Sequence, residues 1–269
     1  MRVAALITNL AMANALFAVN PGAKETTADT KPTEQHEVAI DKPRSAKQTL
    51  DSTPFNTVLE KYLKQGRIGY EEFKADKDAV AQLQAYVDAI ARMPEAEPLS
   101  SWINAYNAIV IHAILERFPL ESVKNAEGGD FRFFREIRYI VADKERSLDD
   151  IEYGFFRSRF EDARIHVALN CGALSCPPLA PQAFESETLD ADLDRLSKII
   201  VNEGHHVYLK NGKLVVNEIF KWFEGDFVRD GGSLLKWIQF YSDNPRIKEL
   251  APDVTIEVYP YDWSLAAEH

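Results

Sequence analysis

Several features that mark large classes of protein are missing from this sequence. It has no run of lysine and arginine residues, and its net charge is −11, so a nucleic-acid partner held through its phosphates is not expected. Beyond the N-terminus it has no apolar stretch of about 20 residues, which argues against an internal membrane span. The CxxC and HExxH spacings of zinc sites are absent as well. Neither a metal nor a cofactor is therefore expected.

The N-terminus has the features of a weak export signal. Arg2 supplies a positive charge, Val3–Met12 is a short apolar stretch, and small residues that suit a cleavage site follow. Residues 1–23 are therefore predicted to be a signal peptide, which would place the protein in the periplasm or outside the cell. An amphipathic N-terminus without export is the alternative. In an oxidising compartment Cys171 and Cys176, the two cysteines of the chain, can form a disulfide.

One folded domain is expected after a linker. Residues 24–53 are poor in large apolar side chains and mix Thr, Lys, Glu and Pro, which is typical of a segment that cannot bury enough surface to fold. The rest of the chain, residues 54–269, is long enough for one domain. Apolar residues make up 46% of the sequence, which is enough for a hydrophobic core.

The spacing of apolar residues predicts helices and strands that do not alternate regularly. Helices are expected over residues 54–63, 77–93, 101–117, 148–159, 188–202 and 234–241, and strands over 131–141, 164–170, 207–216 and 255–258. Asn211-Gly212 marks the turn of a hairpin. The irregular order indicates a single α+β domain, with a buried central helix packed on a small, mostly antiparallel sheet.

The central helix, residues 101–117, is apolar around most of its circumference, so we expect it to be buried. Asn104 and Asn107 stand three residues apart and share a face of this helix. Their amides either bond to the backbone of neighbouring loops or line a pocket. His112, on the same helix, is expected to be a core histidine whose ring nitrogens have partners.

Several motifs together resemble the family called domain of unknown function 547. They are WINAYNAIVIHAILER, the SLDDIEYGFFR helix, RIHVALNCGALSCPPL, IFKWFEGDF and the terminal YDWSL, in the order expected of the family. The resemblance covers roughly residues 100–265. It implies the bacterial stand-alone form, because the leucine-zipper-like region of plant relatives is missing. The chain departs from the pattern at Tyr153, where many relatives have His. The resemblance implies a fold and leaves the reaction open.

A weaker similarity links the segment IHVALNCG to the histidine strand of papain-like and transglutaminase-like folds. In those folds the cysteine opens the central helix, whereas this central helix begins Ser100-Ser101-Trp102. The similarity therefore implies that the nucleophile has either moved to Cys176 or been lost.

The residue types best suited to chemistry gather in residues 164–179. Read as a strand followed by a loop, this segment places His166 on the polar face of the strand and Cys176 in the loop. Pro177 suits the first position of a helical turn, so Cys176 is expected at a helix N-terminus, which stabilises a thiolate. Glu152, on the preceding helix, either complements the helix dipole or orients the imidazole of His166.

Three functions stay open. The first is a thiol-dependent hydrolase or transferase whose catalytic residues are Cys176, His166 and Glu152. The second is a non-catalytic domain that binds a small molecule, a glycan or a peptide, with Cys171 and Cys176 joined in a structural disulfide. The third is an exported structural protein. The residues expected to line the groove of the binding domain are Trp102, Asn104, Asn107, Asn170 and Asp226.

Overall fold

The computed structural model describes residues 50–268. The predicted signal peptide, residues 1–23, lies outside the described residues, as does the predicted linker up to residue 49. Leu50 is buried in the hydrophobic core, ahead of the predicted start of the domain at residue 54. Within the described part of the chain, no helix combines the length and the apolar character needed to cross a membrane.

The first two long helices form where the apolar spacing predicts them, and a small hairpin and a short helix separate them. The bounds are α1 (Thr53–Tyr62), β1 (Leu63–Lys64), β2 (Arg67–Ile68), α2 (Tyr70–Ala75) and α3 (Lys77–Arg92). Pro54 lies in the first turn of α1, where its missing N–H is not needed. The Asp76 carboxylate caps α3 by accepting from the N–H groups of Asp78 and Ala79, each at 3.1 Å.

The central helix α4 (Leu99–Arg117) is buried on every side over residues 100–115, as its apolar circumference predicts. Its main packing partner is α3 rather than the sheet that was expected from the sequence. His112 is confirmed as a satisfied core histidine. Its ring nitrogens lie 2.9 Å from the Tyr139 hydroxyl and 2.7 Å from Gln84 Oε1.

The segment after α4 differs from the strand predicted over residues 131–141. A short 3-10 turn, η1 (Ala126–Gly128), leads into a helix, α5 (Arg132–Arg135), and the strand β3 begins only at Tyr139 (Tyr139–Val141). Phe133 and Phe134 lie in the single turn of α5 and are buried. The aromatic residues that suggested a strand therefore pack into the core from a helix. β3 pairs antiparallel with β4 (Lys144–Arg146).

The predicted capping box opens the next helix. The N–H of Ser147 donates to the Asp150 carboxylate at 2.9 Å, and the N–H of Asp150 donates to Ser147 Oγ at 3.0 Å. The helix begins as a π-helix, η2 (Asp150–Phe156), and continues as α6 (Arg157–Arg159). Single π turns occur often at functional sites, and Glu152 lies within this one.

The strand predicted over residues 164–170 is wrong. Residues Ala163–Val167 form a 3-10 helix, η3, which begins where the Asp162 carboxylate accepts from the N–H of Arg164 at 2.9 Å. His166 is buried as deeply as its apolar neighbours. Alternation of polar and apolar residues indicates a strand when one face is exposed and the other is buried. In this segment the polar positions are buried or half-buried like the apolar ones, so the alternation is not evidence for a strand.

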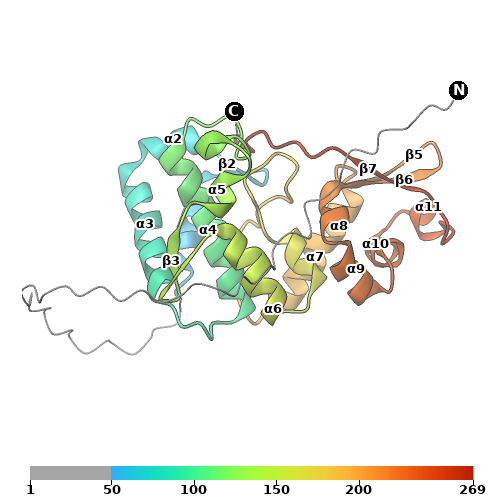
Figure 1. Cartoon of the computed structure of the whole chain (residues 1–269), viewed down its shortest axis with the longest axis horizontal. Helices are drawn as coiled ribbons and strands as arrows, with labels where there is room; N and C mark the ends of the chain where they lie inside the picture. The colour runs from blue at the N-terminus through green and yellow to red at the C-terminus, as the bar shows by residue number, and fades with distance from the viewer. Residues whose placement is uncertain (1–49, 269) are drawn as a thin grey trace, which may run out of the picture. The chain divides into compact units, whose positions relative to one another are not determined.

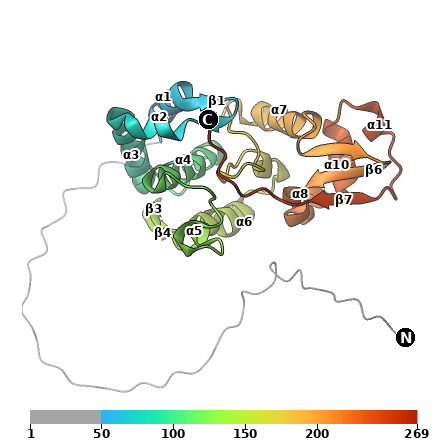
Figure 2. The same ribbon diagram turned by 90° about the horizontal axis from the view of Figure 1, so that it is seen from above.

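The C-terminal part of the domain holds the three-stranded sheet and the helices around it (Figures 1 and 2). The bounds are α7 (Leu189–Asn202), β5 (Val207–Lys210), β6 (Lys213–Asn217), α8 (Glu218–Trp222), α9 (Glu224–Gly231), α10 (Leu234–Tyr241), α11 (Pro245–Lys248) and β7 (Ile256–Tyr259). The predicted hairpin at Asn211-Gly212 is confirmed, because β5 and β6 pair antiparallel across it. β7 pairs with β6 in parallel, and the other pairs of named strands among residues 50–268 are antiparallel.

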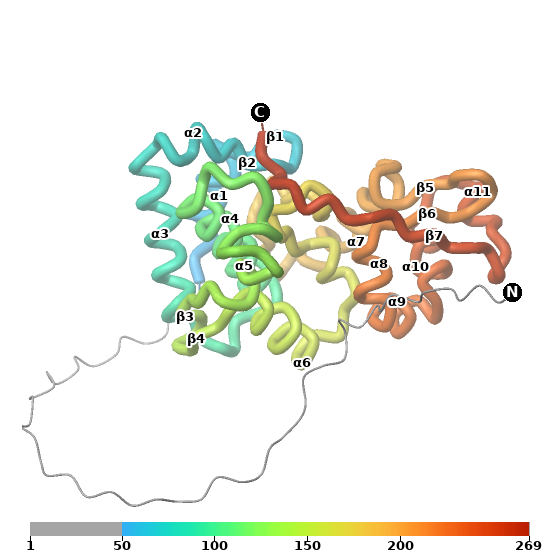
Figure 3. The backbone as a smooth tube through the Cα atoms, turned by 45° about the horizontal axis from the view of Figure 1, so that its top comes forward, coloured from blue at the N-terminus to red at the C-terminus, as the bar shows by residue number. Residues whose placement is uncertain are grey.

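After β7 the chain runs back across the domain as an extended segment, residues 261–268, which we call the C-terminal strap (Figure 3). The strap joins three segments that are far apart in the sequence. The backbone bonds run from Leu265 N–H to Glu121 O (2.9 Å), from Ala266 N–H to Gly172 O (2.8 Å) and from Glu268 N–H to Ile68 O (3.2 Å). The strap therefore brings residues after β7 onto the segment that contains both cysteines.

Candidate functional site

Cys171 and Cys176 close a short loop, residues 171–176, which we call the cysteine loop. The two sulfur atoms lie within disulfide-bonding distance, the Cα atoms are 6.2 Å apart, and neither cysteine is a free thiol. The backbone N–H of Cys171 also donates to Cys176 Sγ at 2.8 Å. Of the arrangements that the sequence left open, the structure thus contains the disulfide.

Cys176 does not lie at a helix N-terminus, contrary to the prediction. Residues 177–180 contain no helix. Instead, Leu179 N–H donates to Gly66 O at 3.2 Å in the turn between β1 and β2. Gly66 has a φ of +78°, and a Cβ atom there would lie 2.5 Å from Pro178 Cβ. This close approach of the hairpin turn fixes the chain after Cys176 in a path that a helical turn would not follow.

Asn170 fixes the start of the cysteine loop from inside. Its Nδ2 donates to Pro177 O at 2.7 Å, and its Oδ1 accepts from Gly172 N–H at 2.9 Å. Gly172 has a φ of +82°, and a Cβ atom there would lie 2.4 Å from Ile114 Cδ1 on α4. The loop therefore rests directly on the central helix, with its two ends held by a single buried amide.

The amides of α4 bond to loop backbone, which is the first of the two roles considered for them. Asn107 Nδ2 donates to Ala168 O at 3.0 Å, and its Oδ1 accepts from Asn170 N–H at 2.9 Å. Asn104 makes the same pair of bonds with Phe184, at 2.9 Å through Nδ2 and at 2.8 Å through Oδ1. Both side chains are almost fully buried. They position the loops that carry the site.

Trp102, which was expected to line a groove, is completely buried. Its ring stacks on Phe155 with the centroids 3.6 Å apart, and the Arg146 guanidinium lies 5.7 Å above it. Trp102 thus belongs to the packing between α4 and η2. Its predicted role in lining a groove stays a prediction, and none of these contacts supports it.

His166 pairs with Asp226, a residue that the sequence placed in a groove rather than beside the histidine. His166 Nε2 lies 2.9 Å from Asp226 Oδ2, and the imidazole stacks on Phe223 with the centroids 3.7 Å apart. Burial lowers the pKa of His166, although the hydrogen bond and charge of Asp226 oppose that shift. Because a carboxylate only accepts, Nε2 donates to Asp226, and the buried Nδ1 has no hydrogen-bond partner among the described residues.

No hydrogen bond or ion pair joins Glu152 to His166. Its Oε2 accepts from the Tyr106 hydroxyl on α4 at 2.8 Å. Burial raises the pKa of Glu152 to about 7, and it raises the pKa of Asp149, one turn earlier, to about 6. Nδ1 of His166 has no hydrogen-bond partner among the described residues, so no hydrogen bond joins His166 to Cys176 or to Glu152.

Two residues beside the cysteine loop were missed by the sequence reasoning. The Tyr261 hydroxyl lies 3.4 Å from Cys171 Sγ, although the two residues are 90 positions apart in the chain. The buried His206 hydrogen-bonds to the backbone of Ser175 and Cys176. Local pattern cannot reveal either contact, because the strap and the turn before β5 reach the loop only in the folded chain.

Three rings that contact one another lie next to the cysteine loop, and we call them the aromatic platform: Trp222, Tyr261 and Trp263. The centroid of Tyr261 lies 4.8 Å from that of Trp222 and 4.5 Å from that of Trp263. Trp222 is 43% exposed and Trp263 is half-buried. Leu174 of the cysteine loop borders the platform, since its N–H donates to Ser264 O at 2.8 Å. An exposed tryptophan beside further rings can stack on a ligand.

Among residues 50–268, no three His, Cys, Asp or Glu side chains gather in an arrangement that would hold a metal ion.

Comparison with known proteins gives one match. No curated protein and no solved structure matches the chain. The model of the family described as protein of unknown function, DUF547, matches residues 90–198. The matched segment starts before the expected residue 100 and ends at residue 198, well before the expected residue 265. It contains α4, η2, His166 and the cysteine loop, whereas the aromatic platform lies beyond it. The match to the segment that carries the cysteine loop therefore supports the DUF547 family that the sequence motifs resemble.

Proposed function

We propose that this domain is a non-catalytic binding domain whose aromatic platform takes a small molecule or a peptide with flat, ring-shaped faces. The observation that carries the proposal is the exposure of Trp222 on two further packed rings, directly beside a loop that a disulfide closes. Aromatic rings present a large apolar area at a low cost in conformational entropy, which suits a binding surface.

The platform is supported from several elements, so it needs no rearrangement to receive a ligand. Trp222 lies at the end of α8, and the other two rings lie on the strap. The N–H of Tyr261 donates to Glu218 Oε2 at 3.0 Å, and Ser122 Oγ donates to Trp263 O at 2.7 Å. Rings that are already fixed lose little freedom on binding.

The charge around the platform restricts the ligand. The carboxylate of Glu218 bonds to the platform backbone, Asp262 is exposed between two of its rings, and the chain carries a net charge of −11. A negatively charged ligand would be repelled. A neutral or positively charged ligand is therefore expected, such as an uncharged oligosaccharide or a proline-rich peptide.

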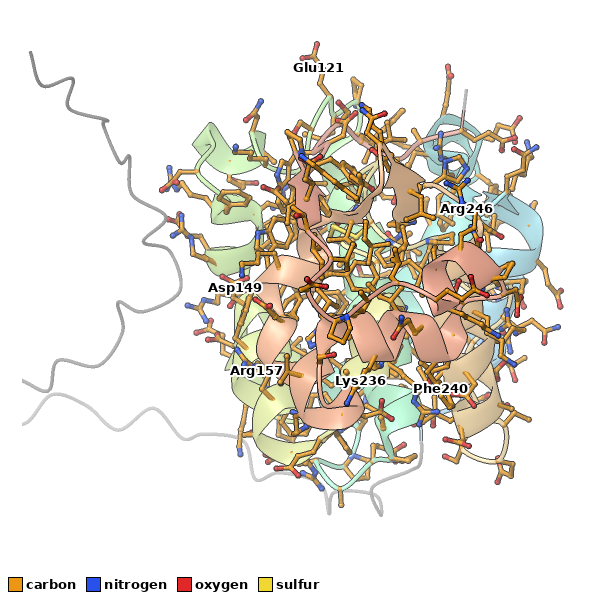
Figure 4. The ribbon with its side chains drawn as sticks, turned by 90° about the vertical axis from the view of Figure 1, so that its right-hand side faces the viewer. Glu121, Asp149, Arg157, Lys236, Phe240 and Arg246 are labelled. Carbon is orange, nitrogen blue, oxygen red and sulfur yellow. A yellow bond between two sulfur atoms is a disulfide. The ribbon has the colours of Figure 1, made fainter. Side chains whose placement is uncertain are left out.

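Tryptophan fluorescence tests the proposal with two probes, a chito-oligosaccharide and a neutral proline-rich peptide. We expect one of them to shift the emission in a saturable way, and we expect Trp222→Ala to weaken binding about tenfold or more. Phe240→Ala is the control, because Phe240 on α10 is 76% exposed and contacts only Tyr241 among the rings (Figure 4). Absence of binding for both probes, or equal losses in the two variants, would contradict a role for the platform.

One observation on His166 favours a second function. Its Nε2 bonds to Asp226, while its Nδ1 has no hydrogen-bond partner among the described residues. A histidine held in this tautomer can act as a general base. The alternative proposal is thus a thiol-dependent hydrolase or transferase with Cys176, His166 and Glu152, in which Asp226 takes over the orienting role. It requires reduction of the disulfide and movement of Cys176 toward Nδ1.

Alkylation of the reduced, folded protein separates the two functions. A catalytic Cys176 is expected to react with iodoacetamide at neutral pH faster than Cys171, and His166→Gln is expected to remove that advantage. An unreactive Cys176 would exclude the thiol enzyme.

Export is proposed on the sequence features of residues 1–23 alone. Expression in a bacterial host followed by fractionation tests it, with N-terminal sequencing of the mature chain. Retention of the intact N-terminus in the cytoplasm would rule export out.

A further inference from the structure

The two cysteines of the pair differ in residue exposure and in the hydrogen bonds of their sulfur atoms. Cys176 is 8% exposed, and its Sγ accepts the backbone N–H of Cys171 at 2.8 Å. Cys171 is partly exposed, and its Sγ lies 3.4 Å from the hydroxyl of Tyr261. This asymmetry matters for thiol exchange, because exchange needs one sulfur that a thiolate can reach and another that is stabilised as it leaves.

We infer that the Cys171–Cys176 disulfide exchanges with external dithiols in one direction, with Cys171 as the attacked sulfur and Cys176 as the leaving thiolate. The inference rests on the cysteine loop alone and is independent of the ligand proposed for the aromatic platform. It assigns an activity, thiol–disulfide exchange, and a substrate class, a neutral dithiol.

The exchange proceeds in two balanced steps. A thiolate of the dithiol attacks Cys171 Sγ, a new S–S bond forms there, and the Cys171–Cys176 bond breaks. Its electron pair goes to Cys176 Sγ, where the thiolate keeps the hydrogen bond from Cys171 N–H. The second thiolate of the dithiol then attacks the first sulfur of the dithiol and releases Cys171 as a thiolate, close to the Tyr261 hydroxyl. The dithiol leaves oxidised, and the loop holds two reduced cysteines.

The surroundings of the loop favour Cys176 as the leaving group by geometry rather than by a nearby positive charge. The turn that contains Cys176 is closed by its N–H, which donates to Ala173 O at 3.0 Å. Leu174 and Ser175 are bonded to the strap, through N–H groups that donate to Ser264 O at 2.8 Å and to Asp262 O at 3.1 Å. Opening the disulfide leaves these bonds intact, so Cys171 N–H stays aimed at the departing sulfur.

The exposed acidic residue Asp262 is bonded to the cysteine loop through its backbone, so we expect its charge to affect which reductants approach. Its backbone N–H donates to Ser175 Oγ at 2.9 Å, which places this acidic residue against the cysteine loop. A reductant with a net negative charge would be repelled there. A neutral thiol such as 2-mercaptoethanol is therefore the appropriate probe for the first step, and because it is a monothiol it cannot complete the second step within one molecule.

Trapping of the mixed disulfide tests the direction of exchange. The folded protein is exposed briefly to 2-mercaptoethanol and quenched with N-ethylmaleimide, and both adducts are located by tandem mass spectrometry. Fragmentation is needed because no lysine or arginine separates the two cysteines. We expect the mercaptoethanol adduct on Cys171 and the maleimide on Cys176, with the reverse pattern at least about tenfold rarer.

Two controls keep the test decisive. In denaturant the preference for Cys171 is expected to disappear, because exposure and the hydrogen bond to Cys176 both depend on the fold. In the Asp253→Asn variant, which changes an exposed residue outside the cysteine loop, the preference is expected to persist, because it rests on those two features. Adducts mainly on Cys176, equal adducts in the folded protein, or a preference that survives denaturation would each overturn the inference.

Discussion

Burial shifts the pKa of His166 and of Glu152 in opposite directions, so their contributions to stability depend on pH with opposite signs. Burial lowers the pKa of His166 below its ordinary value of 6.5. The stability that depends on its neutral form is therefore fully present above pH 6.5 and is lost as the pH falls below 6.5 and through the lowered pKa. Burial raises the pKa of Glu152 from 4.5 to about 7. Its contribution is therefore fully present below pH 4.5 and is lost as the pH rises toward 7.

Replacement of Glu152 by Gln is expected to stabilise the protein at pH 8 and to have little effect at pH 4. The variant removes the cost of ionising a buried carboxyl, which is at most about 3 kcal/mol, and Gln keeps an oxygen for the Tyr106 hydroxyl. Urea unfolding at the two pH values measures the difference. Glu60→Gln, at an exposed position of α1, is the control and should change neither value. Equal effects at both pH values would show that Glu152 is ionised without cost.

Replacement of Asp226 by Asn is expected to lower the free energy of unfolding by about 1–3 kcal/mol, because it weakens a charge-assisted hydrogen bond to a buried ring. The pKa of His166 should fall further, since the Asp226 carboxylate is the group that raises it. Urea unfolding and a histidine NMR titration measure the two effects. Asp253→Asn, at an exposed turn, is the matched control. An unchanged His166 titration would contradict the pairing.

At the scale of elements, the hairpin turn between β1 and β2 acts on the site although it lies far from it in the sequence. Gly66 forms this turn against Pro178. The turn at Gly212, between β5 and β6, has the same backbone conformation, with a φ of +76°, but nothing lies within 4 Å of the position of its Cβ. The two glycines therefore separate the effect of backbone conformation from that of close packing.

Replacement of Gly66 by Ala is expected to cost more stability than replacement of Gly212 by Ala. In both variants a side chain at positive φ lowers the free energy of unfolding by about 1–2 kcal/mol, and only Gly66→Ala adds a clash with Pro178. Thermal unfolding of the two variants measures the difference. Equal losses would mean that the segment after Cys176 can move away from the turn without cost.

Elements whose apolar pattern agrees with their final packing were predicted well. α3, α4, α7 and the β5–β6 hairpin form where periodicity and turn residues place them. The strand predicted at His166 failed for a physical reason, since a short alternating segment can be buried on all sides in a 3-10 helix. Periodicity reports which residues are buried together, and over a few residues it does not distinguish a strand from a tight helix.

At the scale of the whole domain, the C-terminal strap connects elements from the first hairpin to the cysteine loop. Its backbone bonds reach Ile68, Glu121 and Gly172, and it carries two of the three rings of the aromatic platform. Figure 3 shows it crossing from β7 to the N-terminal helices. The site is thus assembled from both ends of the domain rather than within the matched family segment.

Removal of residues 261–269 is expected to destabilise the domain and to loosen the cysteine loop first. Each lost backbone hydrogen bond contributes about 1 kcal/mol, and the buried ring of Tyr261 is lost as well. Hydrogen exchange should show early loss of protection at the N–H groups of Leu174 and Ser175, which bond to the strap. Removal of His269 alone is the control. Unchanged protection at these two amides would contradict the connecting role of the strap.

The sequence by itself determined the buried central helix, the capping box at Ser147, the hairpin at Asn211-Gly212 and the segment where reactive residues gather, because each depends on contacts or spacing within a few residues. Only the tertiary structure decided that Cys176 is paired with Cys171, that His166 bonds to Asp226 rather than to Glu152, and that Tyr261 reaches the cysteine loop. Two of these three contacts join segments 60 and 90 residues apart, and the third depends on how the loop closes on α4. Their partners are chosen by packing, which local sequence patterns do not encode.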